Sequence, residues 1–114
     1  MSFLLMAALA MTSPAPACAF NPANEVIAHA SVATPAFEAA DRKWFIDSET
    51  VSFAGGTYGK YGLPRQLSPM EIEAAGDKDD LPIFIEAGHY VDEPEVIYIM
   101  VKSADCSFQP YERQ

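Results

Sequence analysis

Two runs of apolar residues in the second half of the chain constrain its fold more than any other feature. They extend from Leu81 to Ala87, where Glu86 is the one charged residue, and from Val96 to Val101. Both are rich in β-branched residues and bounded by turn residues, which favours strands over helices. Because neither run alternates with polar residues, each strand should be buried on both faces. A small chain could cover both faces by curling into a barrel, by laying a helix and loops across the sheet, or by using a partner.

A hairpin is predicted over residues 50–61. Two alternating segments flank Gly55 and Gly56, and a Gly-Gly pair suits the positive φ of tight hairpin turns. With these two glycines as the turn, Phe53 would face Tyr58. The apolar runs would form another hairpin over 81–102.

One short helix is predicted over residues 69–75. Ser68 is a suitable N-cap, Pro69 fits the first helical position, and Glu71 would complete a capping box. Gly76 would end the helix. The expected fold class is therefore α+β, mostly antiparallel β, as a small barrel-like or sheet-plus-helix domain. Residues 44–46 are expected to add a short strand.

The first 43 residues resemble a targeting segment followed by a tether. Residues 1–19 carry no ionisable side chain, include nine successive apolar residues, and end in Ala17-Cys18-Ala19. This pattern predicts a signal peptide cleaved after Ala19, although no Lys or Arg precedes the apolar stretch. Lipidation of Cys18 is the alternative. Residues 20–43 are rich in Ala and Pro and are interpreted as a flexible linker, which leaves 44–114 as the folded β-rich domain.

Charge and hydropathy exclude two classes of function. The chain has 16 acidic and 7 basic residues and a net charge of −9. This balance argues against nucleic acid as a partner, because such binding depends on basic surface. No apolar run approaches the roughly 20 residues of a membrane span. The predicted signal peptide gives the expected location as exported, either periplasmic or secreted.

The cysteines and histidines give weak catalytic and metal signals. Cys18 and Cys106 are the only cysteines, and a disulfide between them is permitted in an oxidising compartment. Cys106 with His89 or nearby acids would support an alternative, a small hydrolase-like enzyme. His89 is the only histidine of the predicted domain, which is too few for a zinc site. No metal site or cofactor is predicted from these residues.

An acidic run at residues 77–80 supports a further alternative, a calcium-stabilised secreted module. The run begins with alternating acids but lacks the Gly and Glu that an EF-hand loop needs later. A looser site would have to add the acids of residues 92–95.

Aromatic and cationic residues gather in one segment and predict a binding surface. Two phenols and two cations lie close together in this acidic chain, and such residue types recur at binding hot spots. The candidates are Tyr58, Lys60, Tyr61 and Arg65, with His89 and Tyr90 from a predicted loop. The leading hypothesis is a small exported, non-catalytic module that binds a protein or another envelope component. A homo-oligomer formed through the apolar sheet would be one version of it.

Overall fold

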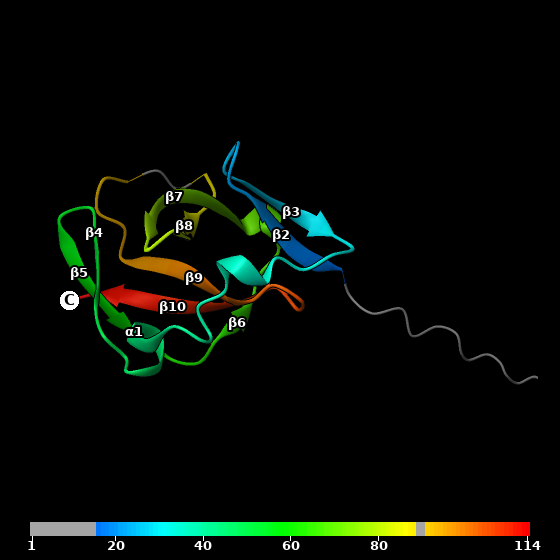
Figure 1. Ribbon diagram of the computed structural model, residues 1–114. Helices are drawn as coiled ribbons and strands as arrows, with labels where there is room; N and C mark the ends of the chain where they lie inside the picture. Colours follow the sequence, from blue (N-terminus) through cyan, green and yellow to red (C-terminus); the bar gives the residue numbers. More distant parts are fainter. Residues whose placement is uncertain (1–15, 89–90) are drawn as a thin grey trace, which may run out of the picture.

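The computed structural model describes residues 16–88 and 91–114 and is built mostly of antiparallel strands (Figure 1). The strands are β2 (Ala17–Asn21), β3 (Val26–Ala30), β4 (Val51–Phe53), β5 (Gly56–Lys60), β6 (Arg65–Gln66), β7 (Ile72–Lys78), β8 (Leu81–Glu86), β9 (Val96–Lys102) and β10 (Ser107–Arg113). Helical structure in these ranges is limited to α1 (Lys43–Ile46) and the 3₁₀ turns η2 (Pro35–Phe37) and η3 (Pro69–Glu71). None of the helices found there is long and apolar enough to cross a membrane.

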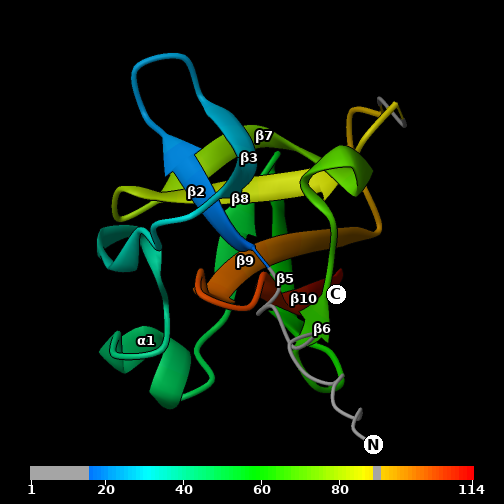
Figure 2. The ribbon, with the colours of Figure 1, turned by 90° about the vertical axis from the view of Figure 1, so that its right-hand side faces the viewer.

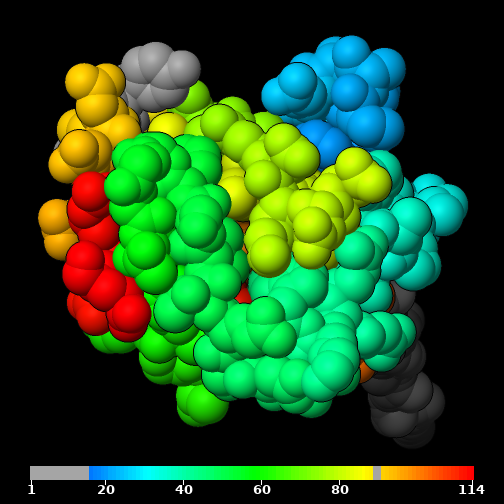
Figure 3. Space-filling model, turned by 60° about the vertical axis from the view of Figure 1, so that its left-hand side comes forward, coloured from blue at the N-terminus to red at the C-terminus, as the bar shows by residue number. Residues whose placement is uncertain are grey.

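Seven strands form one curled sheet. Its order is β4-β5-β10-β9-β8-β7, with β6 paired to β10, and the strand pairs are antiparallel. The two ends of this order approach each other, as the β4–β5 hairpin (green) lies against β7 (yellow-green) in Figure 3. The Phe53 ring of β4 comes so close to Gly76 of β7 that a side-chain carbon there would lie 2.9 Å from it. The sheet is therefore a half-barrel, which agrees with the predicted antiparallel β class.

Strands β8 and β9 confirm the two predicted apolar strands. They pair with Ile83 opposite Ile99 and Phe84 opposite Tyr98. Because successive residues of a strand point to opposite faces, Ile83 and Phe84 enter different clusters. Both faces of these strands are buried, as their unbroken apolar sequence predicts.

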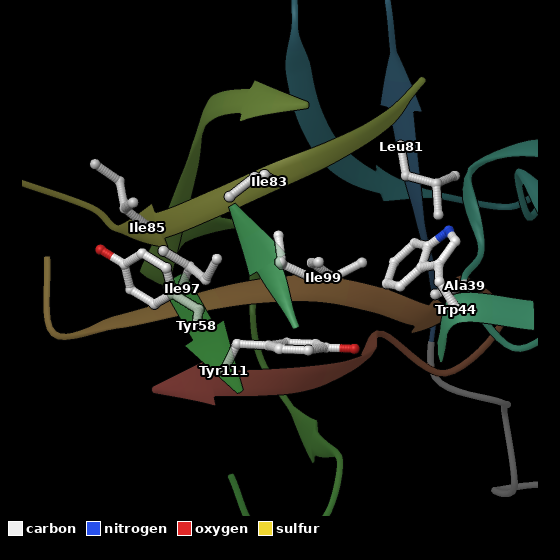
Figure 4. Packing of buried hydrophobic residues seen from close by; sticks show 10 residues of the cluster. Ala39, Trp44, Tyr58, Leu81, Ile83, Ile85, Ile97, Ile99 and Tyr111 are labelled. Carbon is white, nitrogen blue, oxygen red and sulfur yellow. The ribbon is translucent and has the colours of Figure 1, made fainter. Parts of the chain in front are cut away.

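The inner cluster fills the concave side of the half-barrel (Figure 4). Its side chains come from five strands, from α1 and from the segment before α1, and they pack between β5, β8, β9 and β10. Its members are Ala39, Trp44, Val51, Tyr58, Leu81, Ile83, Ile85, Ile97, Ile99 and Tyr111.

The outer cluster lies on the other face of the sheet, beneath the hairpin of β2 and β3. Figure 2 shows this hairpin crossing β8 and β7. The members of the outer cluster are Cys18, Phe20, Ile27, Leu67, Ile72, Phe84, Met100, Cys106 and Phe108. The sheet is thus covered within one chain, which removes the sequence-based argument for a partner or oligomer on its apolar faces.

The N-terminal segment differs from the predicted linker. Strand β3, η2 and the start of α1 all lie within residues 20–43. Phe20 and Ile27 are buried in the outer cluster, and Ala39 is buried in the inner one. Composition alone does not reveal these elements, because Ala-rich sequence is compatible with a tether, a helix or a covered strand.

The predicted helix over 69–75 is corrected to the single 3₁₀ turn η3. The capping box is present: Met70 N donates to Ser68 Oγ, and Ser68 N donates to Glu71 Oε1 at 2.7 Å. From Ile72 onward the chain instead pairs with β8, opposite Glu86 to Leu81. A ladder along a strong strand outweighs the weak preference of this short segment for a helix.

Two smaller corrections concern the first hairpin and residues 44–46. The turn uses Ala54 and Gly55, both at positive φ, so Phe53 faces Gly56 and Val51 faces Tyr58. The turn therefore begins one residue earlier than predicted, and each residue of β4 faces a partner two positions earlier in β5 than predicted. Residues 44–46 form most of α1 rather than a strand, and Trp44 reaches the inner cluster from it.

Candidate functional site

Tyr58 is a core residue, although the sequence placed it among the binding candidates. It is fully buried in the inner cluster. Its hydroxyl donates to the carbonyl oxygen of Pro94 at 2.6 Å and accepts from Arg113 Nη1 at 3.3 Å. The hydrogen bond to Tyr58 raises the pKa of the Arg113 guanidinium. Lys60 is half-buried, and its Nζ lies 3.7 Å from the centre of the Phe45 ring, a cation–π contact.

The loop of residues 61–64, termed the β5–β6 loop, is the part of the predicted segment that reaches the surface. Tyr61 is 50% exposed and Leu63 is 83% exposed. The loop backbone is nevertheless held, because Tyr61 N donates to the Pro110 carbonyl and Gln109 Nε2 donates to the Gly62 carbonyl, both at 3.0 Å. Gln109 is itself buried in β10. The structure thus presents two large side chains to solvent on an anchored backbone.

Arg65 follows this loop at the start of β6, where it pairs with Phe108. Its side chain is exposed. In the described ranges the ion pairs between bases and acids involve Lys43, Lys78 and Arg113, and Arg65 forms none with a described acid. The loop and Arg65 therefore combine apolar, aromatic and cationic groups. Sequence reasoning missed Gln109, whose only local signal is an amide between the apolar residues Phe108 and Pro110.

His89 and Tyr90 lie outside the described residues. The structure consequently neither joins these two binding candidates to the β5–β6 loop nor separates them from it. The same holds for the His89 half of the hydrolase hypothesis, while its other half, Cys106, is described and is bonded to Cys18.

A disulfide joins Cys18 of β2 to Cys106, which ends the turn between β9 and β10. The two Cα atoms are 5.1 Å apart, although 88 positions separate the residues in sequence. Both cysteines are buried in the outer cluster. The bond occupies the Cys106 sulfur that thiol catalysis would need and the Cys18 sulfur that lipidation would modify. Cleavage after Ala19 would also cut β2 beside Cys18.

A polar cluster centred on Ser103 reinforces this junction. The Glu38 carboxylate accepts from both Ser103 N and Ser103 Oγ, at 2.9 and 2.6 Å. Ser103 Oγ accepts from Thr34 N, and the Ser103 carbonyl accepts from Cys18 N at 2.8 Å. Ser103 is fully buried, so these bonds also satisfy polar atoms that water cannot reach. The turn after β9 is therefore fastened to the N-terminal segment by covalent and polar contacts.

The acidic run at residues 77–80 has a structural explanation. Asp79 and Asp80 both have positive φ and form the two-residue turn between β7 and β8. Asp tolerates this left-handed conformation better than most residues. Asp79 also pairs with Lys78, and Glu93 of the other predicted calcium-binding group pairs with Arg113. Within the described ranges, these acids do not gather into a group that could hold a metal ion.

Searches against protein-family models, curated proteins and solved structures found no match.

Proposed function

We propose that this protein is a small exported, non-catalytic binding module that presents the β5–β6 loop and Arg65 to a protein partner in the cell envelope. The observation that carries the proposal is the pairing of exposed side chains with a fixed backbone at residues 61–65. A preorganised loop loses little conformational entropy on binding, so more of its contact energy appears as affinity. Tyr and Arg are also enriched among residues that dominate binding energy.

The charge of this surface supports a partner with an acidic patch beside an apolar one. Arg65 and the half-buried Lys60 flank Tyr61 and Leu63 in a protein whose net charge is −9. Local positive charge on an acidic protein would orient a partner so that its acids meet Arg65. Leu63 would then enter an apolar pocket of the partner.

The disulfide supports an exported location. Disulfides persist in oxidising compartments and are rare in reducing ones, and a buried one is typical of exported proteins. A signal peptide at the N-terminus would supply the route. Because Cys18 belongs to the folded protein, we infer that any cleavage occurs before Cys18 rather than after Ala19. The intact mass of the mature protein would locate the cut.

A site-specific photocrosslinker can test the binding proposal. Placed at Leu63 in the exported protein, it should give one discrete covalent adduct, which Arg65→Glu should weaken. Met70 is the matched control, since it is 87% exposed and lies outside the loop. Equal adducts from positions 63 and 70, or no adduct at 63 in a folded protein, would contradict the proposal.

A further inference from the structure

We propose that the reduced form of the protein binds one thiophilic metal ion, such as Zn²⁺, through Cys18, His29 and Cys106. A ligand atom from each of these three residues lies within 4.8 Å of the other two. Among the described residues, this is the group of three His, Cys, Asp or Glu side chains whose ligand atoms lie close enough together to hold one metal ion. Thiolate and imidazole are the donors that zinc favours in proteins.

The strand pairing explains why His29 lies beside the disulfide. His29 of β3 stands directly opposite Cys18 of β2, so the two side chains share one face of the hairpin. The same face carries the opposed pair Phe20 and Ile27, which enter the outer cluster. Cys106 approaches from the turn after β9. Three separate segments thus converge on one point, as metal sites require.

The spacing is compatible with coordination after a small movement. Around tetrahedral zinc, with Zn–S bonds of about 2.3 Å, two sulfurs are about 3.8 Å apart. In a disulfide they are about 2 Å apart, so the thiolates must separate by somewhat less than 2 Å after reduction. The sulfur-to-nitrogen distances, at most 4.8 Å, would shorten to about 3.6 Å in the same geometry. Side-chain rotations are sufficient for changes of this size.

His29 gives the site access to solvent. The two cysteines are buried, whereas His29 is exposed and borders a hollow that is walled largely by small residues, including Ala17, Ala30 and Ala104. An ion can therefore enter beside His29. Three protein ligands leave a fourth position that a water molecule entering through this hollow could occupy.

The chemistry balances with a thiol reductant. Two molecules of that thiol transfer two electrons and two protons to the Cys18–Cys106 bond, giving two protein thiols and the disulfide of the reductant. The ion then displaces both thiol protons to solvent and forms two metal–sulfur bonds, and a lone pair of His29 supplies the third bond. Binding therefore competes with reoxidation of the disulfide.

The experiment uses the full chain, reduced with a phosphine and desalted without oxygen. Calorimetry should show one Zn²⁺ bound per chain, with proton release, and Co²⁺ should give the visible absorption of a tetrahedral thiolate site. His29→Ala should weaken Zn²⁺ binding by about 100-fold or more, since loss of outer-shell partners alone costs 10–100-fold. Glu112→Ala, at an exposed position near the other end of β10, is the control and should leave the affinity unchanged.

Three results would overturn the proposal. They are Zn²⁺ binding that is equal in the wild type and His29→Ala, binding that is equal in the oxidised protein, and no stoichiometric binding at all. Unfolded thiols also bind zinc, so the titration is repeated in denaturant. Equal affinity there would show that the fold does not assemble the site, and it would count against the proposal even if reduction unfolds the chain.

Discussion

The inner and outer clusters share strands β8 and β9 but are closed in different ways. The inner cluster is enclosed by the curling of one sheet and by α1, with residues that begin at Ala39. The outer cluster needs the β2–β3 hairpin, which a disulfide and the Ser103 hydrogen bonds fasten to the far end of the chain. One side of the sheet is thus enclosed by the sheet itself, whereas the cover of the other side is held in place by a disulfide and hydrogen bonds.

The two clusters also differ in whether their buried polar atoms are hydrogen-bonded. Among the described side chains, Trp44 Nε1 and the Tyr111 hydroxyl of the inner cluster are buried without a hydrogen-bond partner. Ser103, at the edge of the outer cluster, has its hydroxyl and both backbone groups bonded. An unpartnered buried donor costs about 1–3 kcal/mol, so the inner cluster has stability to gain by losing a polar atom.

The largest expected effect comes from removing the disulfide. A crosslink that closes a loop of 88 residues stabilises by about 4–5 kcal/mol in the chain-entropy estimate. Cys18→Ser with Cys106→Ser should lower the free energy of unfolding by about that amount in urea titrations. In hydrogen exchange, amides of β2 and β3 should lose protection before those of β5 and β10.

A matched variant separates the crosslink from the backbone at Cys106. This residue has a φ of 55°, a left-handed conformation that glycine adopts without strain. Cys18→Ser with Cys106→Gly should therefore be about 1 kcal/mol more stable than the double serine variant. In hydrogen exchange on either disulfide-free variant, equal loss of amide protection in both clusters would show that the clusters unfold as one unit.

The next effect is a fall in stability at high pH that arises in the inner cluster. Burial raises the pKa of Tyr111 to about 12. The folded state holds this proton more tightly than the unfolded state, whose pKa is about 10. The stabilisation is therefore complete below about pH 10 and is lost as the pH rises through about 12, by about 2–3 kcal/mol. Urea titrations of wild type and Tyr111→Phe across this range should diverge, because only the wild type carries this phenol and loses stability as the phenol ionises.

Ser103→Ala tests the hydrogen bonds that join the turn after β9 to the N-terminal segment. The substitution removes the hydroxyl that donates to Glu38 and accepts from Thr34 N. Loss of a hydrogen bond to a charged group costs about 1.5–3 kcal/mol, and we expect about 2 kcal/mol in urea titrations. In the disulfide-free background the same change should cost less, since both changes loosen the same junction. Full additivity would mean that the two contacts act independently.

The smallest expected effects have opposite signs at two tyrosines of one cluster. Tyr58→Phe removes the donor to the buried Pro94 carbonyl and should destabilise by about 1–2 kcal/mol. Tyr111→Phe removes a hydroxyl without a partner and should be neutral or stabilise by up to about 1 kcal/mol at neutral pH. Thermal unfolding of the two variants provides the measurement. Equal destabilisation would indicate that the Tyr111 hydroxyl does find a partner.

The candidate site could be predicted from sequence only as a segment. Residue types between Tyr58 and Arg65 indicated binding, but no local pattern could separate buried Tyr58 from exposed Tyr61. That separation depends on the sheet curling around Tyr58 and on Gln109 holding the loop from a strand 47 positions away. Likewise, β7 and β10 escaped prediction because their residues alternate poorly and become strands only beside β8 and β9.

The sequence by itself determined the elements whose signals are local. Branched apolar residues specify β8 and β9, the Gly55-Gly56 pair predicts a hairpin within one residue of its observed turn, and Ser68 with Glu71 specifies a capped turn. Only the tertiary structure decided which segment covers the second face of the sheet and that the two cysteines form a disulfide. Covering that face brings Cys18 to Cys106 across 88 positions. Such closure is driven by non-directional burial of apolar area, which leaves no periodic trace in the N-terminal sequence.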